Sequence, residues 1–113
     1  MEVTTAQAGS VGIVRVGETR LMYPLLADFA AAVTGLVSAG SHDLLIDLTP
    51  VTYIDSATIG CLMDLYRQVH AGGGRLKLSG VQKRVQTMLT LTGAPNFIDI
   101  HADESAAITS FGA

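Results

Sequence analysis

Hydrophobic residues form several short runs along the chain, separated by polar turns and by stretches with helical spacing. Residues 11–16 (VGIVRV) form an apolar run that a glycine ends, and this pattern predicts a strand. Weak alternation in residues 2–8 predicts an edge strand, and residues 75–78 and 97–100 predict two further strands. Residues 44–48 (LLIDL) are almost continuously apolar, which is typical of a central strand buried on both faces.

Four amphipathic stretches follow or separate these strands and predict helices. Pro24 suits the first turn of a helix, where its missing N–H is not needed, and glycines end the next stretches. The helices are expected from Pro24 to just before Gly40, from Ser56 to just before Gly72, from Val81 to Gly93, and from Asp103, a good N-cap, to Phe111. This alternation predicts an α/β fold with a mostly parallel sheet, and we expect one layer of helices on a sheet centred on residues 44–48.

Length and composition agree with one domain over residues 1–113. Half of the residues are apolar (49%) and Trp is absent, so aliphatic side chains must form the core. Cys61 is the only cysteine, so no disulfide can form within the chain, and we expect a small buried side chain. The net charge of −3 and the lack of a Lys/Arg run count against non-specific nucleic-acid binding.

Nothing in the hydropathy pattern indicates targeting to a membrane. The first ten residues are polar and do not resemble a signal peptide. The longest apolar stretch, residues 25–37, contains Asp28 and Thr34 and is too short to cross a bilayer. We therefore expect a cytoplasmic protein without membrane insertion.

Several patterns that could indicate catalysis or a cofactor do not fit their templates. The glycines at 72–74 lack the Lys-Ser or Lys-Thr of a P-loop and follow a helix instead of opening one. His42, His70 and His101 have no second ligand at metal-binding spacing, and no G-x-S-x-G elbow surrounds Ser56. We predict no metal, no cofactor, no catalytic residue and no enzymatic activity.

The segment 53–60 (YIDSATIG) is the most informative part of the chain. Ser56 is a good N-cap for the helix that follows, with its hydroxyl accepting a hydrogen bond from the N–H of Thr58 or Ile59. A phosphate at the same position would add about −1.5 to −2 charges next to the free amides of a helix N-terminus, which can accept it without a change of fold. On residue chemistry alone, both a structural cap and a phosphorylation switch are possible.

A resemblance to a known family favours the switch. Residues 45–60 join an aliphatic strand ending in Asp-Leu-Thr to an Asp-Ser pair with a glycine shortly after, residues 72–76 form a Gly-rich turn before a strand, and the third helix ends in Leu-Thr-Gly. From about Val11 to Phe111 the chain resembles the STAS family, which includes anti-sigma-factor antagonists and the cytoplasmic domains of sulfate transporters. The resemblance implies the STAS fold, with a mixed, mostly parallel sheet of four to five strands and about four helices.

The resemblance also implies a function and a site. An anti-sigma-factor antagonist binds an anti-sigma serine kinase when unphosphorylated, frees the sigma factor, and is restored by a separate serine phosphatase after phosphorylation. Carried over to this sequence, Ser56 is the phosphoacceptor. The implied partner-binding residues are Asp55, Ser56, Ala57, Thr58, Ile59, Gly60, Arg20 and Asp47.

Departures from the family pattern leave alternatives open. Thr58 and Ile59 stand where Gly and Leu are usual, and Arg20 lies in a turn where relatives often carry an acid. Arg20 is expected to be a solvated surface residue, to pair with Asp47 or Glu18, to reach a phosphate on Ser56, or to mark a branch with a different partner. The alternative functions are a STAS scaffold in a stress-signalling complex and a soluble STAS subunit of a lipid-transport ABC system.

Overall fold

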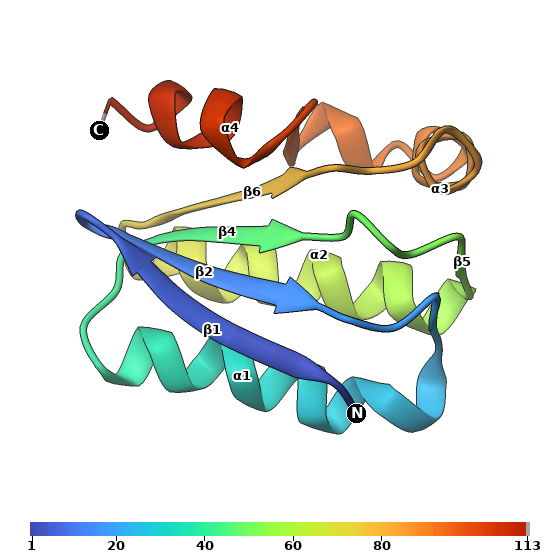
Figure 1. Ribbon diagram of the computed structural model, residues 1–113, viewed down its shortest axis with the longest axis horizontal. Helices are drawn as coiled ribbons and strands as arrows, with labels where there is room; N and C mark the ends of the chain where they lie inside the picture. Colours follow the sequence, from blue (N-terminus) through green and yellow to red (C-terminus); the bar gives the residue numbers. More distant parts are fainter. Residues whose placement is uncertain (113) are drawn as a thin grey trace.

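A computed structural model describes residues 1–112, and its centre is a five-stranded mixed sheet with the order β1-β2-β4-β6-β7 (Figure 1). The strands are β1 (Val3–Ala8), β2 (Val11–Val16), β4 (Asp43–Asp47), β6 (Arg75–Ser79) and β7 (Asp99–His101). β1 is antiparallel to β2, and every other neighbouring pair is parallel. The predicted α/β class, the mostly parallel sheet and the central position of β4 are therefore confirmed.

The four α-helices are α1 (Leu26–Ser38), α2 (Ser56–Ala71), α3 (Lys83–Leu91) and α4 (Glu104–Ser110). Gly40 and Gly93 follow α1 and α3 in left-handed backbone conformations (φ 106° and 78°), as expected for helix stops. The first α-helix begins slightly later than expected, at Leu26. Pro24 lies in the 3₁₀ turn η1 (Tyr23–Leu25), which directly precedes α1.

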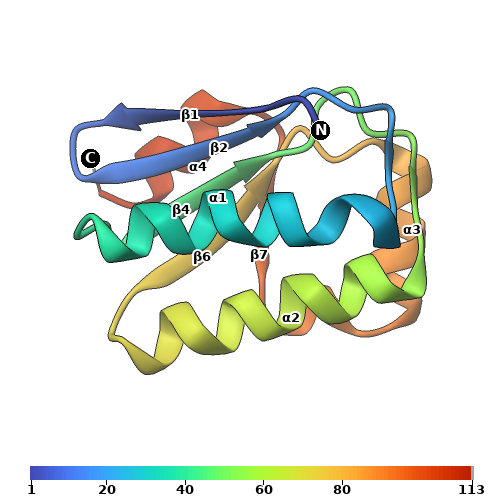
Figure 2. The ribbon, with the colours of Figure 1, turned by 90° about the horizontal axis from the view of Figure 1, so that it is seen from below.

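The helices form two layers, and the expectation of one layer is wrong. Figure 2 shows α1 and α2 side by side over one face of the sheet, and α4 lies on the opposite face. Side chains alternate along β4, so Leu44 and Ile46 enter the main core, whereas Leu45 enters a smaller core with Ala107 and Phe111 of the α4 segment. Both faces of β4 are apolar and must be shielded from water. The helices α1 and α2 shield one face, and α4 shields the other.

A second, two-stranded sheet pairs β3 (Arg20–Leu21) with β5 (Tyr53–Ile54). Next to it, the N–H of Thr52 donates to the carbonyl of Thr19 at 2.7 Å. With two residues in each strand, this sheet has no detectable sequence pattern. It holds the turn after β2 against the segment that leads into α2.

The last strand starts later than predicted. Residues 97–100 were expected as the strand, but β7 begins at Asp99 because the 3₁₀ turn η2 (Ala94–Asn96) delays it. The N–H groups of Phe97 and Ile98 both donate to the carbonyl of Ala94, at 3.0 Å each, and are not available to a sheet neighbour.

Truncation of Leu45 tests the second core. Leu45 is fully buried between the sheet and α4, so Leu45→Ala should lower the free energy of unfolding by about 2–5 kcal/mol. Leu91→Ala is the matched control, because Leu91 is 82% exposed and should change stability by less than about 0.5 kcal/mol. Chemical denaturation monitored by circular dichroism measures both, and equal losses would contradict the packing described for α4.

Candidate functional site

Asp55, and not Ser56, caps the N-terminus of α2, which corrects the expectation for the cap. Asp55 has an extended backbone, and its Oδ1 accepts hydrogen bonds from the N–H of Thr58 at 2.8 Å and from the Thr58 hydroxyl at 2.7 Å. Its Oδ2 accepts a hydrogen bond from the N–H of Tyr23 at 3.0 Å. One carboxylate thus joins the start of α2 to η1, the turn that leads into α1.

These hydrogen bonds also keep Asp55 ionised. Partial removal from water raises the pKa of its carboxyl group, but the hydroxyl of Thr58 and the N–H groups of Tyr23 and Thr58 outweigh that effect. The net result is a pKa of Asp55 below the ordinary value. The site therefore holds a fixed negative charge directly before Ser56.

Ser56 is the first residue of α2 and is exposed to solvent. Within residues 1–112, its hydroxyl takes part in no hydrogen bond, and the N–H groups of Ser56 and Ala57 have no acceptor. Two free amides at the start of a 16-residue helix form a favourable environment for an anion. The arrangement can accept a phosphate on Ser56 without a rearrangement of the backbone.

Thr58 faces the interior, although the resemblance implied that it is one of the partner-binding residues. Its side chain is fully buried, and its single hydroxyl proton is shared between the carbonyl of Leu21 and Oδ1 of Asp55, each 2.7 Å from the hydroxyl oxygen. A β-branched residue thus replaces the usual glycine without narrowing the approach to Ser56. Thr58 ties the small β3–β5 sheet to the helix start and offers no side-chain surface to a partner.

The rest of the expected docking edge lies at or near the surface. Gly60 is exposed, and Ala57 and Ile59 are half-buried. A shallow groove of about 390 Å³ runs between α1 and α2 beside this edge. Tyr23, which is 73% exposed, lines the end of the groove nearest Asp55. An exposed aromatic residue next to a shallow apolar groove is typical of surfaces that contact another protein.

Arg20 forms none of the predicted ion pairs. Its guanidinium carbon lies 5.0 Å from the centre of the Tyr53 ring, in cation–π contact, and the guanidinium carbon of Arg84 lies 5.8 Å from the same ring. Neither Asp47 nor Glu18 reaches Arg20 within the described part of the chain. Tyr53 and Arg84 were not among the predicted site residues, because only the fold brings α3 to β5.

Asp47 lies away from Ser56, on the face of the sheet that α4 covers. Its Oδ1 accepts hydrogen bonds from the N–H and the hydroxyl of Thr49, and it neighbours Glu104 of α4. Burial and the hydrogen bond with Glu104 raise the pKa of Asp47. Glu104, held by the Arg15 guanidinium at 2.7 Å, has its pKa lowered to about 2.

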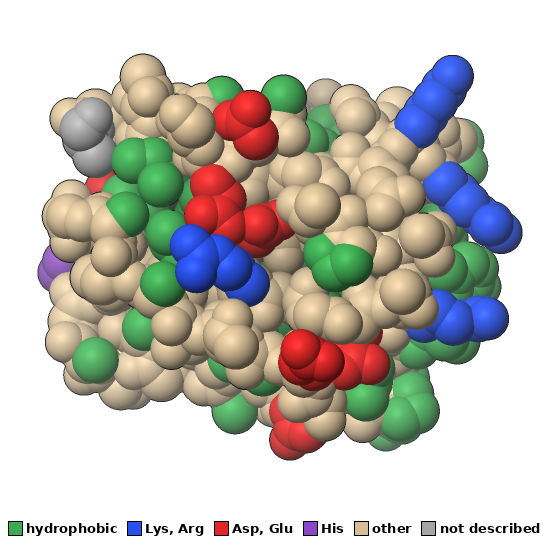
Figure 3. Space-filling view, in the orientation of Figure 1, with side chains coloured by type: hydrophobic (Ala, Val, Ile, Leu, Met, Phe, Trp, Pro, Cys, Tyr) green, Lys and Arg blue, Asp and Glu red, His purple; other side chains and the backbone are tan. Residues whose placement is uncertain are grey.

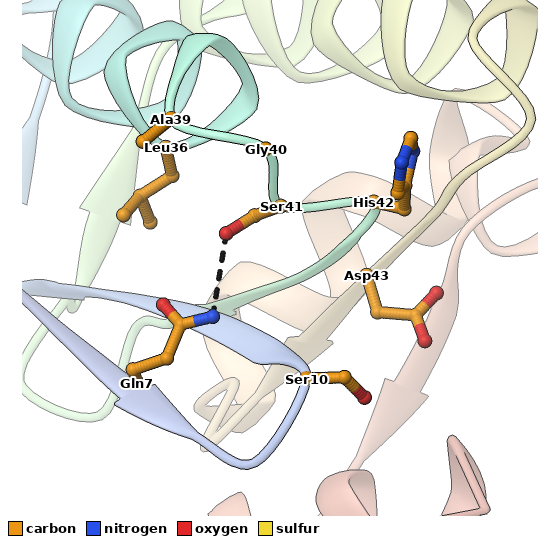
Figure 4. A pocket seen from close by; sticks show the side chains of 8 residues that line it. All are labelled: Gln7, Ser10, Leu36, Ala39, Gly40, Ser41, His42 and Asp43. Atoms are coloured by element: carbon orange, nitrogen blue, oxygen red, sulfur yellow. Dashed lines mark hydrogen bonds between the residues drawn. The ribbon is translucent and has the colours of Figure 1, made fainter.

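The other hollows are separate from this site. The one in Figure 4 lies between the end of α1 and the hairpin that joins β1 to β2, at the opposite end of the sheet from Ser56. There the amide of Gln7 donates to the hydroxyl of Ser41 at 3.4 Å. In residues 1–112, no three His, Cys, Asp or Glu side chains are placed to bind a metal ion. None of the helices in that range combines the length and the apolar character needed to cross a membrane.

Comparison with known proteins identifies the family. A model of the STAS domain matches residues 2–107, so the chain belongs to the STAS domain family. The anti-sigma-B factor antagonist of Bacillus subtilis is 33% identical over 66 residues, which are 58% of this chain. The match spans 61% of that relative, or about three-fifths of its length.

Solved structures share the fold over nearly the whole chain. An anti-sigma-factor antagonist domain protein from Planctomyces limnophilus is similar with a TM-score of 0.88 and 16% identity, covering 98% of each chain. The Bacillus protein SpoIIAA in its phosphorylated form is similar with a TM-score of 0.74 and 15% identity, covering 97% of this chain and 99% of that chain. These similarities confirm the STAS fold that the sequence predicted.

The cap can be tested by comparing two neighbouring residues. Asp55→Ala removes three hydrogen bonds at the start of α2 and should lower the free energy of unfolding by about 1–2 kcal/mol. Ser56→Ala removes no hydrogen bond and should change it by less than about 0.5 kcal/mol. Urea denaturation of both variants measures the difference. A larger loss for Ser56→Ala would show that the serine is the cap.

The Arg15–Glu104 pair should make stability fall in acid. The folded pKa of Glu104, about 2, lies below its ordinary value of 4.5, so the pair stabilises the folded state above pH 4.5 and loses this effect as the pH falls toward 2. Because Arg15 is 46% exposed, we expect at most about 1 kcal/mol. The stability difference between wild type and Glu104→Gln should shrink over that range. A difference that does not change with pH would contradict the pairing.

Proposed function

We propose that this protein is an anti-sigma-factor antagonist that binds an anti-sigma serine kinase while Ser56 is unphosphorylated, and that phosphorylation of Ser56 switches it off. A serine phosphatase acting on phospho-Ser56 would restore binding. The observation that carries the proposal is the exposed hydroxyl of Ser56, which makes no hydrogen bond at the start of a helix capped by Asp55. A hydroxyl without a structural role can be modified without loss of a cap.

Local electrostatics supports phosphorylation at this position. The phosphate would bring about −1.5 to −2 charges and three acceptor oxygens to the free N–H groups of Ser56 and Ala57. The helix dipole at the same end favours a negative charge. The fold can therefore stay as it is while the charge of the outer surface changes strongly, which is what a binding switch requires.

The shape of the surface supports docking next to the same serine. Next to Ser56, Ala57 and Gly60 line the groove between α1 and α2, with Tyr23 at its margin. We propose that this continuous edge contacts the kinase. We place Arg20 on this edge because it contacts Tyr53, which precedes the edge in the chain. Thr58 supports the edge from the interior, and Asp47 lies on the face of the sheet that α4 covers, away from the edge.

The named relatives agree with this proposal. The Bacillus subtilis relative is an anti-sigma-B factor antagonist, and SpoIIAA is a STAS-fold protein with a phosphorylated form. We propose by this likeness that the chain acts in the cytoplasm, through binding and without catalysing a reaction. The side chain of Thr58 is buried, so it cannot serve as a contact for a partner in a scaffold or in a lipid-transport system. It therefore favours neither of these alternatives.

Intact-mass measurement after incubation with ATP and the cognate kinase tests the phosphorylation. We expect the addition of one phosphate to wild type and none to Ser56→Ala. Ser38→Ala, which changes an exposed serine at the end of α1, is the matched control and should be phosphorylated like wild type. A phosphate that remains on Ser56→Ala would locate the modified residue elsewhere and overturn the choice of Ser56.

Binding of two Ser56 variants separates charge from structure. Ser56→Asp adds a permanent negative charge that the helix dipole tolerates, whereas Ser56→Ala adds none. We expect Ser56→Asp to bind the kinase at least about tenfold more weakly than Ser56→Ala, which corresponds to about 1.4 kcal/mol. Calorimetric titration with the purified kinase measures both affinities. Equal affinities would remove Ser56 from the binding surface.

A further inference from the structure

The cations of this protein divide into two groups. Four of the seven Lys and Arg residues form ion pairs with carboxylates, at 2.7–3.7 Å: Arg15 with Glu104, Arg67 with Asp64, Arg75 with Asp43, and Lys77 with Asp99. The other three, Arg20, Lys83 and Arg84, have no carboxylate within 4.0 Å in residues 1–112. All three are exposed.

The three unpaired cations gather at one end of the molecule, and two of them, Arg20 and Arg84, lie against the ring of Tyr53. Arg20 pairs with Tyr53 in the β3–β5 sheet, and the guanidinium groups of Arg20 and Arg84 lie 5.0 and 5.8 Å from its ring centre. Lys83 precedes Arg84 in the first turn of α3. Figure 3 shows Lys and Arg side chains projecting from the edge where Figure 1 places α3 and β5. We call Arg20, Lys83 and Arg84, together with Tyr53, the basic cluster.

The position of Lys83 and Arg84 does not favour stability of the helix. They occupy the first turn of α3, which contains no acidic residue, and Gln82 gives α3 no side-chain cap. The N-terminus of a helix carries a positive partial charge, so cations there are unfavourable. The helix end and the three cations add their positive potentials instead of cancelling them, in a protein whose net charge is −3. A local positive field of this kind favours a negatively charged partner surface.

We propose that the basic cluster is the electrostatic half of the docking surface and that it binds an acidic, Asp/Glu-rich face of the protein that docks at Ser56. This inference rests on the proposed function and adds the chemistry of the partner. Tyr53 is three residues before Ser56 in the chain, so one partner can cover both. Three cations are few for nucleic acid, whose binding commonly uses six to ten phosphate contacts, and the net negative charge opposes it.

The basic cluster also gives the switch a physical mechanism. A phosphate on Ser56 would add about −1.5 to −2 charges to the one already on Asp55, and so would offset much of the positive charge of the basic cluster. Attraction of an acidic partner would fall accordingly, even if no atom of the backbone moved. Arg20 would then serve both states, attracting the partner before phosphorylation and lying near the phosphate afterwards.

Association kinetics with the purified cognate kinase tests the proposal. Arg84→Glu should lower the association rate constant several-fold, roughly three- to tenfold, at low ionic strength, with a smaller effect on dissociation. The difference should nearly disappear at about 0.5 M salt, where charges are screened within a few ångströms. The control is Arg75→Glu, which makes the same charge change on an exposed arginine at the start of β6, away from the groove between α1 and α2, and should leave the rate close to wild type. Thermal melting verifies that both variants are folded.

The outcomes separate this inference from the proposed function. If the kinase binds and both variants associate like wild type, the basic cluster is not a docking element, although the proposed function stands. If a DNA oligonucleotide binds wild type tightly and Arg84→Glu abolishes that binding, the partner chemistry is wrong. If the kinase does not bind at all, the proposed function fails, and a fluorescent oligoglutamate peptide replaces it as the probe. Peptide binding that only Arg84→Glu weakens supports the cluster, and no peptide binding overturns it.

Discussion

The carboxylate of Asp55 is the interaction on which the site depends. Its two oxygens accept hydrogen bonds from both the N–H and the hydroxyl of Thr58 and from the N–H of Tyr23, so it fixes where α2 begins and how the helix meets the turn before α1. Because Asp55 caps the helix, the hydroxyl of Ser56 is not needed as a cap, and Ser56 lies exposed on the first turn. The exposed hydroxyl of Ser56 and the residue that stabilises the helix start are thus adjacent but separate.

Below the surface, Thr58 supports the start of α2 from the interior. Thr58 is buried, and its hydroxyl links the cap to the carbonyl of Leu21 in β3. β3 pairs with β5, which leads directly into Asp55, so the small sheet, the cap and the helix start form one connected unit. The buried Thr58 therefore belongs to the interior of the site and leaves the approach to Ser56 open.

Local patterns predicted most elements because each has a local physical cause. The apolar run of β4, the helical spacing of α1 and α2, and the glycine stops can all be read within a few residues. The helix from Asp103 was predicted, but its place on the opposite face of the sheet was missed, because the side on which a helix packs is not encoded in its local pattern. Ser56 was taken for the cap because serine and aspartate are equally good caps, and only the backbone geometry distinguishes them.

The basic cluster could not be predicted, because it exists only in three dimensions. Arg20 and Arg84 are 64 positions apart, and no run of Lys or Arg marks either one. The pairing of β3 with β5 brings Arg20 to Tyr53, and the return of the chain through β6 brings α3 to the same ring. Tyr53, at the centre of this positive charge, lies three residues before Ser56 in the chain. A charge distribution of this kind gives a phosphate a large effect on binding while the fold remains unchanged.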